Sequence, residues 1–324
     1  MNAVAARGSA VEDALARLRA ELGARGGAAW PRGVVGAHAA DGSALYAYPE
    51  IAGYWLQWAS ARADVAAGHA DSVLDWLAGA RLGGGAWPTR VGAAASDPAY
   101  ASADYLYDHA MLWLGLRRFG LARQSQRALA LADSVWEALG RYLEDGRLIA
   151  GRGVLPPRWS GQLGPFLLKA CAHLRHGTGG VAQAAAAAVP QLAAQTLAQP
   201  HREAHPQLYA IEGLLLLGQR EPARQALDAL LAAHGGVARL CESVDGGARR
   251  SDVLAQALRA ALLLGFPRSA DWQDLAAELA ARVDVHGRLP FVPFADARPT
   301  WAALFAEQAL SLWCGEALAA EDLV

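Results

Sequence analysis

Polar side chains that could carry acid–base chemistry recur near the start of several apolar stretches of this sequence. Glu50, Asp108 and Asp252 each lie close to the beginning of such a stretch, and His205 stands directly before Pro206 at another. Carboxyl and imidazole groups are common proton-transfer groups in enzymes. We therefore predict that Glu50, Asp108, Asp252 and His205 are catalytic.

Aromatic, amide and charged side chains flank these four residues. Aromatic faces stack on sugar rings, stabilise carbocations or fill a core. Arginine pairs with a carboxylate through two parallel hydrogen bonds, so Arg249, Arg250 and Arg298 are expected to recognise an anionic group such as a uronate carboxylate. The predicted substrate-binding residues are Tyr48, Tyr105, Tyr107, Trp159, Gln162, Tyr209, Glu212, Arg249, Arg250, Arg298 and Trp301.

The predicted catalytic residues also have structural explanations. Glu50, Asp108 and Asp252 fall in or near a first helical turn, where a carboxylate accepts hydrogen bonds from free backbone N–H groups and interacts favourably with the helix dipole. His205 fits an ordinary loop histidine. Their joint occurrence at equivalent places in separate segments favours function for the group.

Charged side chains inside apolar stretches form a separate class. Glu212 lies in Tyr-Ala-Ile-Glu-Gly-Leu-Leu and Glu307 in Leu-Phe-Ala-Glu-Gln-Ala-Leu, where a carboxylate must be paired, hydrogen-bonded or protonated. Arg259 is the natural partner of one of them. A structural ion pair between neighbouring helices is therefore the alternative to a binding role, and Lys169, the only lysine, has the same two interpretations.

Two kinds of helical stretch alternate along the chain and must position these residues. Ala-rich amphipathic stretches, typical of surface helices, are expected at Val11–Ala24, Ala66–Ala80, Leu121–Leu143, Val181–Leu197, Glu221–Ala233 and Ser269–Val283. Stretches that are apolar nearly all round, typical of buried helices, are expected at Pro49–Arg62, Ser102–Phe119, Ser160–His176, Pro206–Gln219, Ser251–Phe266 and Thr300–Leu318. The alternation predicts an all-α fold, an (α/α)6 toroid with a ring of inner helices inside a ring of outer helices.

An open α-solenoid of helical hairpins would show the same alternation. A closed ring is favoured because the inner stretches are apolar and neither end shows a polar capping repeat. We therefore expect residues 1–324 to form a single domain. In a ring, the starts of the inner helices line one mouth of a central cavity, which is where the candidate residues fall.

Proline and glycine mark several expected helix boundaries. Pro190 and Pro200 are expected to interrupt the fourth outer helix. Glycines in a left-handed conformation, which commonly follow a helix end, are expected to close four inner helices at Gly120, Gly218, Gly265 and Gly315.

The stretch Asp71–Trp87 resembles the QW repeat of the squalene–hopene cyclase and prenyltransferase toroid superfamily. In that pattern Gln, three residues, Gly, one residue and Trp close each hairpin; here Arg81 takes the place of Gln, while Gly85 and Trp87 match. The general layout is also similar to that of six-hairpin glycosidases and sugar epimerases. The resemblance implies the toroid fold and no particular activity.

Missing motifs argue against several chemistries of these families. The chain has no Asp-x-Asp-Asp or Asp-Asp-x-x-Asp run, so the acids of triterpene and ionising cyclases are absent. Protein prenyltransferases need an Asp, Cys and His zinc set, and no motif places a histidine beside Cys241. We expect no metal and no cofactor.

Composition limits the classes of partner. Hydrophobic residues make up 54% of the 324 residues and charged residues 19%, which is ample for a large core. The net charge of −2 without a basic block predicts neither a nucleic-acid nor a membrane partner. The absence of an apolar N-terminal segment and of CxxC spacing among three cysteines predicts a cytoplasmic protein.

These observations together predict a carbohydrate-active enzyme of the hydrolase, lyase or epimerase type, with carboxylates at the mouth of a toroid cavity. The expected ligand is a small molecule or oligosaccharide. A terpene-cyclase or prenyltransferase-like enzyme would explain the 11 tryptophans but lacks its acid motifs. A non-catalytic toroid that binds a ligand is the third possibility, and the sequence does not indicate an oligomeric state.

Overall fold

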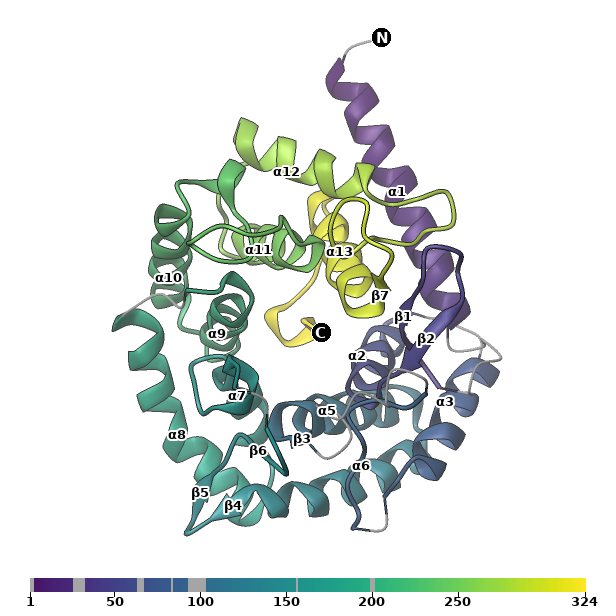
Figure 1. Ribbon diagram of the computed structural model, residues 1–324, viewed down its shortest axis with the longest axis vertical. Helices are drawn as coiled ribbons and strands as arrows, with labels where there is room; N and C mark the ends of the chain where they lie inside the picture. Colours follow the sequence, from purple (N-terminus) through teal and green to yellow (C-terminus); the bar gives the residue numbers. More distant parts are fainter. Residues whose placement is uncertain are drawn as a thin grey trace.

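The computed structural model describes residues 3–25, 33–62, 67–82, 84–92, 103–155, 157–198 and 202–324, and its helices form two concentric layers (Figure 1). The inner layer consists of α2 (Pro49–Ser60), α5 (Leu106–Arg123), α7 (Leu167–Leu174), α9 (Ala204–Leu216), α11 (Ser251–Leu263) and α13 (Thr300–Trp313). The outer layer consists of α1 (Ala3–Arg25), α3 (Ala67–Gly79), α6 (Gln126–Leu139), α8 (Gly179–Ala198), α10 (Arg220–Ala233) and α12 (Ala270–Ala281). No described helix is long and apolar enough to span a membrane.

The inner ring is closed. Each inner helix packs against the next one in the sequence, and α13 packs against α2 to complete the circle. A small sheet seals the same seam, because β1 (Val35–His38) pairs with β2 (Ala44–Ala47) on one side and with β7 (Arg298–Pro299) on the other. In the outer layer, α1 packs against α12. The predicted (α/α)6 toroid is therefore confirmed, and the open solenoid is excluded.

Short strands also form in the loops that lead to the inner helices. β3 (Asp104–Tyr105) pairs with β6 (Gly151–Arg152), and β4 (Leu143–Glu144) pairs with β5 (Arg147–Leu148). The β4–β5 turn places Asp145 and Gly146 at positive φ, 50° and 74°. The sequence pattern predicts none of these strands, because pairings of two residues are too short to show a period-2 alternation.

Several helix boundaries differ from expectation. α7 begins at Leu167, later than the expected Ser160, because Trp159–Gly161 form a separate 3-10 turn. α5 continues past Gly120, and Gln124 with φ of 54° supplies the left-handed residue instead. Pro190 lies inside a continuous α8. Some residues named or spanned by the sequence-based predictions lie outside the described residues. They are the expected helix ends Ala66 and Ser102, Gly83 within the run that resembles a QW repeat, and Pro200.

Three glycine helix ends are confirmed. Gly218, Gly265 and Gly315 follow α9, α11 and α13 with φ of 73°, 74° and 89°. Each lets the chain leave an inner helix in the left-handed conformation that disfavours other residues.

The run that resembles a QW repeat closes the hairpin after α3. The Trp87 indole is buried and donates through Nε1 to the carbonyl oxygen of Leu77 at 2.8 Å. The guanidinium of Arg81 lies 5.6 Å from the centre of the Trp87 ring, so the arginine covers the tryptophan face. The turn is thereby tied to the end of α3.

Glycines allow the inner helices to pack backbone against backbone. A Cβ atom placed on Gly115 of α5 would lie 1.9 Å from the carbonyl oxygen of Gly53 on α2. A Cβ on Gly213 of α9 would lie 2.7 Å from the backbone of Lys169 on α7. The backbones of the two helices are therefore in contact at each crossing, and a larger residue than glycine fits there only if the helices move apart.

Candidate active site

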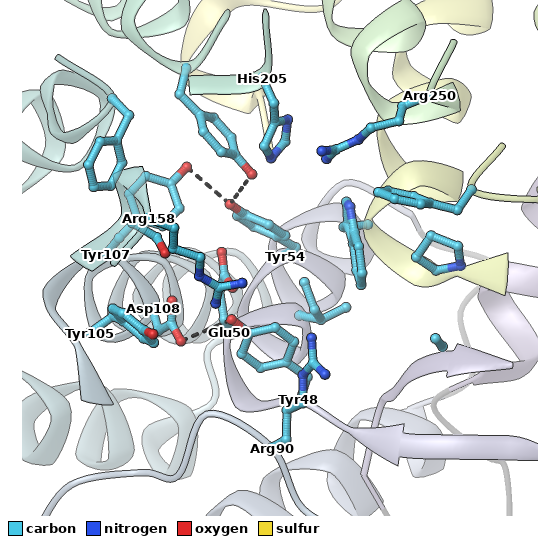
Figure 2. Close-up of a pocket in the computed structure, with 18 of the residues that line it drawn as sticks. Tyr48, Glu50, Tyr54, Arg90, Tyr105, Tyr107, Asp108, Arg158, His205 and Arg250 are labelled. Atoms are coloured by element: carbon cyan, nitrogen blue, oxygen red, sulfur yellow. Dashed lines mark hydrogen bonds between the residues drawn. The ribbon is translucent and has the colours of Figure 1, made fainter. Parts of the chain in front are cut away.

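A cavity of about 590 Å³ lies at the N-terminal ends of the inner helices (Figure 2). Its walls come from the first turns of these helices and from the loops that enter them, as the toroid predicts. The sequence-predicted residues that line it are Tyr48, Glu50, Tyr105, Tyr107, Asp108, Trp159, His205, Tyr209, Arg250 and Trp301.

The other predicted site residues do not line the cavity. Gln162 is exposed beyond the Trp159–Gly161 turn. Arg249 pairs with Glu278 at 2.7 Å outside the ring mouth, and Arg298 donates to the carbonyl oxygen of Ala295. Their predicted contact with a substrate has no support in the structure.

Asp252, a predicted catalytic residue, and Glu212, a predicted substrate-binding residue, are both fully buried and do not line the cavity. Each carboxylate pairs with an arginine, Asp252 with Arg250 and Glu212 with Arg259. Helix periodicity predicts which face of a helix a residue lies on. It does not predict whether other side chains lie between that residue and the cavity.

Two carboxyl groups face each other at one side of the cavity. Glu50 lies in the first turn of α2, directly after Pro49, and Asp108 lies in the first turn of α5. The two helices pack together, which brings the first turns side by side. The Tyr48 hydroxyl donates to Oδ2 of Asp108 at 3.0 Å, and Figure 2 shows Glu50 next to this pair.

The two carboxyl groups hold protons more tightly than isolated ones. Burial raises the pKa of Glu50, while the hydroxyls of Tyr48 and Tyr54 oppose the shift. Burial and then the neighbouring Glu50 charge raise the pKa of Asp108 well above its usual range. Because like charges at close range cannot both ionise easily, the pair titrates as a unit and keeps a proton that a free carboxyl would have lost.

A cluster of tyrosines forms the deep wall of the cavity. The Tyr54 hydroxyl donates to Tyr107 at 3.1 Å and lies 3.4 Å from the Tyr209 hydroxyl. Burial raises the pKa of all three, so they remain neutral donors. The sequence-based prediction omits Tyr54, although it follows Glu50 by four residues on α2 and so shares its helix face.

Arginines line the cavity on two sides. Arg90 and Arg158 lie beside the acidic pair, whereas Arg250 lies near His205 on the other side, as Figure 2 shows. The positive charges of Arg158 and Arg90 oppose the rise in the Asp108 pKa. Arg90 is missing from the prediction because it lies in a loop. A loop has no helical periodicity, so the spacing of its residues does not predict which way a side chain points.

An ion pair anchors the His205 side. Arg250 contacts both carboxylate oxygens of Asp252, at 3.1 and 2.6 Å, and Trp301 donates its indole N–H to the same carboxylate at 3.1 Å. Burial alone would raise the pKa of Asp252, but the Arg250 charge outweighs it and lowers the value to about 2. Asp252 is therefore an ionised anchor for Arg250 and Trp301. Its predicted catalytic role stays a prediction, because Asp252 does not itself line the cavity.

His205 is uncharged at neutral pH. Burial lowers its pKa to about 4, although the Asp252 carboxylate opposes the shift. Its ring packs against the Tyr209 ring with centroids 4.4 Å apart and against the Trp159 ring at 5.8 Å. The imidazole therefore belongs to the aromatic wall.

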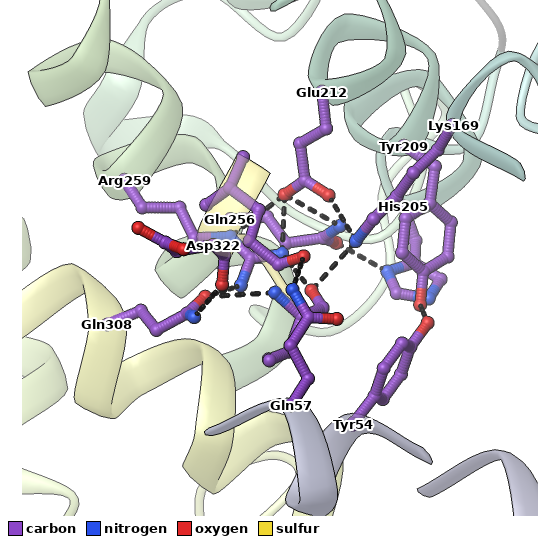
Figure 3. Close-up of polar contacts among 12 residues, drawn as sticks. Tyr54, Gln57, Lys169, His205, Tyr209, Glu212, Gln256, Arg259, Gln308 and Asp322 are labelled. Atoms are coloured by element: carbon purple, nitrogen blue, oxygen red, sulfur yellow. Dashed lines mark hydrogen bonds and ion pairs between the residues drawn. The ribbon is translucent and has the colours of Figure 1, made fainter. Parts of the chain in front are cut away.

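A buried polar network lies behind the tyrosine wall (Figure 3). Glu212 accepts from Arg259 Nε at 2.8 Å and from Lys169 Nζ at 2.9 Å, and all three side chains are fully buried. The predicted Glu212–Arg259 ion pair is confirmed. Glu307, the other candidate partner, pairs instead with Arg19 at 2.8 Å.

The last residues of the chain enter the centre of the ring and complete this network. The carbonyl oxygen of Val324 accepts from Lys169 at 2.7 Å and from Arg259 at 2.9 Å. Gln308 and Gln57 donate to the carbonyl oxygens of Asp322 and Leu323. Figure 1 shows this segment inside the inner ring, and the side chains of Leu323 and Val324 are fully buried.

Within the described residues, no group of three or more His, Cys, Asp or Glu side chains is placed to hold a metal ion. His234 does lie beside Cys241, at 3.8 Å, although no sequence motif indicates it. Four carboxyl groups line the cavity, those of Glu50, Asp108, Glu203 and Glu242, together with tyrosines and arginines. This arrangement is suited to proton transfer and to binding a polar ligand.

No protein-family model matches the chain, and no curated protein sequence does either. Several solved structures are similar. A D-mannose isomerase matches with a TM-score of 0.65 and 12% identity over 93% of this chain and 96% of its own. The fold is the α/α toroid. An unsaturated glucuronyl hydrolase specific for heparin matches with a TM-score of 0.62 and 12% identity. The match covers 95% of the present chain and 97% of the hydrolase chain.

A type II terpene cyclase from Scytonema shares the toroid as well. It matches with a TM-score of 0.60 and 12% identity over 95% of this chain and 99% of its own. Identities this low show the common fold alone, because one fold carries many activities. Function must therefore be argued from the side chains of the cavity.

Proposed function

We propose that this protein is a carbohydrate-active enzyme that uses the Glu50–Asp108 pair for acid–base catalysis, in a hydrolase, lyase or epimerase type of reaction. The observation that carries the proposal is a carboxyl pair with raised pKa values inside an aromatic cavity. Such a pair can serve as proton donor and proton acceptor in acid–base catalysis. The D-mannose isomerase and the glucuronyl hydrolase, both named for sugar substrates, have the same fold.

Asp108 is the better proton donor of the pair, because its pKa lies well above the usual range while tyrosine hydroxyls hold the pKa of Glu50 lower. Asp108 would protonate a departing or carbonyl oxygen of the sugar. Glu50 would take a proton from the attacking water or the substrate. The neutral tyrosine hydroxyls beside them would hydrogen-bond the sugar hydroxyls.

The arginines favour a substrate with an anionic group. Arg90 and Arg158 stand next to the acidic pair, where a uronate carboxylate bound by one of them would place its sugar ring against Trp159. These two residues take the place of Arg249 and Arg298, which point elsewhere. Arg250 already pairs with Asp252 and with Glu242 at 3.0 Å.

An isoprenoid substrate is less well supported. A cavity for a carbocation needs aromatic walls with few competing charges. This cavity has the aromatic walls, but three arginines and the Glu50–Asp108 pair also line it. The polar lining therefore argues for a sugar. The whole chain would act as one domain, because the wall combines residues of α2, α5, α9 and α13 with the loops that precede α7 and α11.

A ligand screen by thermal unfolding tests the proposal. Neutral sugars, uronate-containing oligosaccharides and prenyl diphosphates are compared, because a ligand that binds only the native state raises the melting temperature. We expect a rise with uronate oligosaccharides, and turnover of the compound that binds. Asp108→Asn should lower turnover by about 10²- to 10⁴-fold, whereas Asp228→Asn, at an exposed position of α10, should not.

Two results would overturn the proposal. One is a rise in melting temperature with prenyl diphosphates and with none of the sugars. The other is full turnover by the Asp108→Asn enzyme, which would remove the acidic pair from the chemistry.

A further inference from the structure

His205 is held by contacts that distinguish its two ring nitrogens. Nδ1 lies 2.6 Å from Oε1 of Gln256, within hydrogen-bond distance. The nearest carboxylate oxygen, Oδ2 of Asp252, lies 3.7 Å from the same nitrogen, beyond a normal hydrogen bond. Nε2 has no hydrogen-bond partner among the described residues and is not one of their buried unpartnered atoms, so it reaches the cavity that His205 lines.

The orientation of the Gln256 amide follows from Glu212. Nε2 of Gln256 lies 3.4 Å from Oε1 of Glu212, on the side away from the histidine. Glu212 is ionised, because the charges of Arg259 and Lys169 outweigh burial and lower its pKa. An ionised carboxylate attracts the amide N–H2 and repels the amide oxygen, so the oxygen must face His205.

The Gln256 oxygen in turn decides which nitrogen of His205 carries the proton. A carbonyl oxygen can only accept, so a contact of 2.6 Å requires a proton on Nδ1. In a neutral imidazole the other nitrogen then has a free lone pair. Figure 3 shows this chain of contacts from Arg259 and Lys169 through Glu212 and Gln256 to the imidazole.

We propose that Glu212 and Gln256 are positioning residues that hold His205 in the Nδ1-protonated tautomer, so that Nε2 is a proton acceptor in the cavity wall opposite the Glu50–Asp108 pair. The proton acceptor role rests on the proposed function, whereas the tautomer does not. The assignment deepens that function, because it adds a second proton acceptor, a neutral imidazole, on the wall opposite the Glu50–Asp108 pair.

The step assigned to His205 is a single proton transfer. An O–H bond of a substrate hydroxyl or of a water breaks, its electron pair stays on the oxygen, and the proton forms a new N–H bond at Nε2. The resulting imidazolium keeps its Nδ1–H bond to Gln256. Its positive charge lies close to the ionised Asp252, which stabilises it. When the product leaves, the N–H bond at Nε2 breaks and the proton passes to a water in the cavity, which restores the neutral imidazole.

Charged groups from the neighbouring helices surround the ring. Asp252 and Arg250 face it from the start of α11, and Glu212 lies on α9. The rings of Tyr209 on α9 and Phe305 on α13 lie tilted beside it, at centroid distances of 4.4 and 6.5 Å. The imidazole therefore has little freedom to turn over, and its tautomer depends on the Gln256 contact.

Nitrogen-15 NMR of the full-length protein at neutral pH tests the tautomer, with the His205 signals assigned by their absence in His205→Gln. We expect a protonated Nδ1 and an unprotonated Nε2 in the wild type. In Gln256→Met, which keeps the volume and removes the acceptor, the fraction protonated at Nδ1 should fall. Gln57→Met is the matched control, because Gln57 is also buried but bonds only to carbonyl oxygens near the end of the chain. It should leave the His205 signals unchanged.

A proton on Nε2, or a charged His205, in the wild type at neutral pH would overturn the proposal. An unchanged tautomer in folded Gln256→Met would remove Gln256 from it. Once a substrate is known, Gln256→Met should lower kcat about 10-fold or more with little change in KM. Failure of the sugar screen with the expected tautomer present would count against the proposed function and not against the positioning residues.

Discussion

Tyr48 donates a hydrogen bond to Oδ2 of Asp108 at 3.0 Å and thereby links the residue before α2 to the first turn of α5. The bond favours the ionised form of Asp108, and Tyr48 also favours the ionised form of Glu50. A single hydroxyl therefore tunes both carboxyl groups of the acidic pair. Burial pushes their pKa values up, and Tyr48 limits the rise.

Tyr48→Phe should shift the pH–rate profile to higher pH. Loss of the hydroxyl removes an interaction that lowers both carboxyl pKa values, so both rise further. The acidic limb, where Glu50 must lose its proton, and the alkaline limb, where Asp108 must keep its proton, then move in the same direction. The measurement is kcat/KM against pH, with Tyr142→Phe as the control, because the Tyr142 hydroxyl contacts His109 outside the cavity. A profile that stays in place would separate Tyr48 from the acidic pair.

Asp252→Asn should make the protein less stable at neutral pH and remove part of its sensitivity to acid. The pKa of Asp252 is about 2 in the fold and about 3.9 in an unfolded chain. Because the folded value is lower, the stabilisation is fully present above about pH 4 and is lost as the pH falls toward 2. It amounts to roughly 2–3 kcal/mol of unfolding free energy.

Urea unfolding of wild type and Asp252→Asn between pH 2 and pH 7 checks this expectation. The two curves should approach each other at low pH and separate above pH 4. Parallel curves would show that Asp252 is not the ionised anchor of Arg250.

Glu212→Gln should destabilise the protein far more than Lys169→Met. Loss of the Glu212 charge leaves Lys169 and Arg259 buried side by side without the side-chain carboxylate that both contact, which costs about 3–5 kcal/mol. Loss of the Lys169 charge leaves the Glu212–Arg259 pair intact. Thermal unfolding of the two variants gives the order, and equal losses would contradict the charge balance described here.

Gly115→Ala should strain the contact between α2 and α5. The added Cβ would meet the Gly53 carbonyl oxygen at 1.9 Å, so the helices must separate, at a cost of about 1–3 kcal/mol. Because α2 and α5 carry Glu50 and Asp108, the shift should also lower activity.

Gly79→Ala is the matched control for this variant. A Cβ on Gly79, at the end of α3, meets no atom within 4 Å, and the stability should stay the same or rise slightly. A wild-type melting temperature in Gly115→Ala would show that the crossing tolerates a side chain.

Much of the ring and part of the site follow from the sequence. The outer and inner helices differ in how far around the helix the apolar residues extend, and this pattern is local, so it predicts the alternation without knowledge of the fold. The same pattern places Glu50, Asp108 and His205 near inner-helix starts, which line the cavity in the structure. Arg90 carries no such signal because it comes from a loop.

Hydrophobic periodicity alone determined which helices are buried. A buried helix face requires apolar residues three and four positions apart, and this spacing is visible in the sequence. Only the tertiary structure decided what each buried polar group contacts. Glu50 and Glu212 are both carboxylates in apolar helices, yet one lines the cavity and the other lies behind it between Lys169 and Arg259. The reason is physical: depth and charge pairing depend on segments distant in the chain, among them the last residues, which lie inside the inner ring.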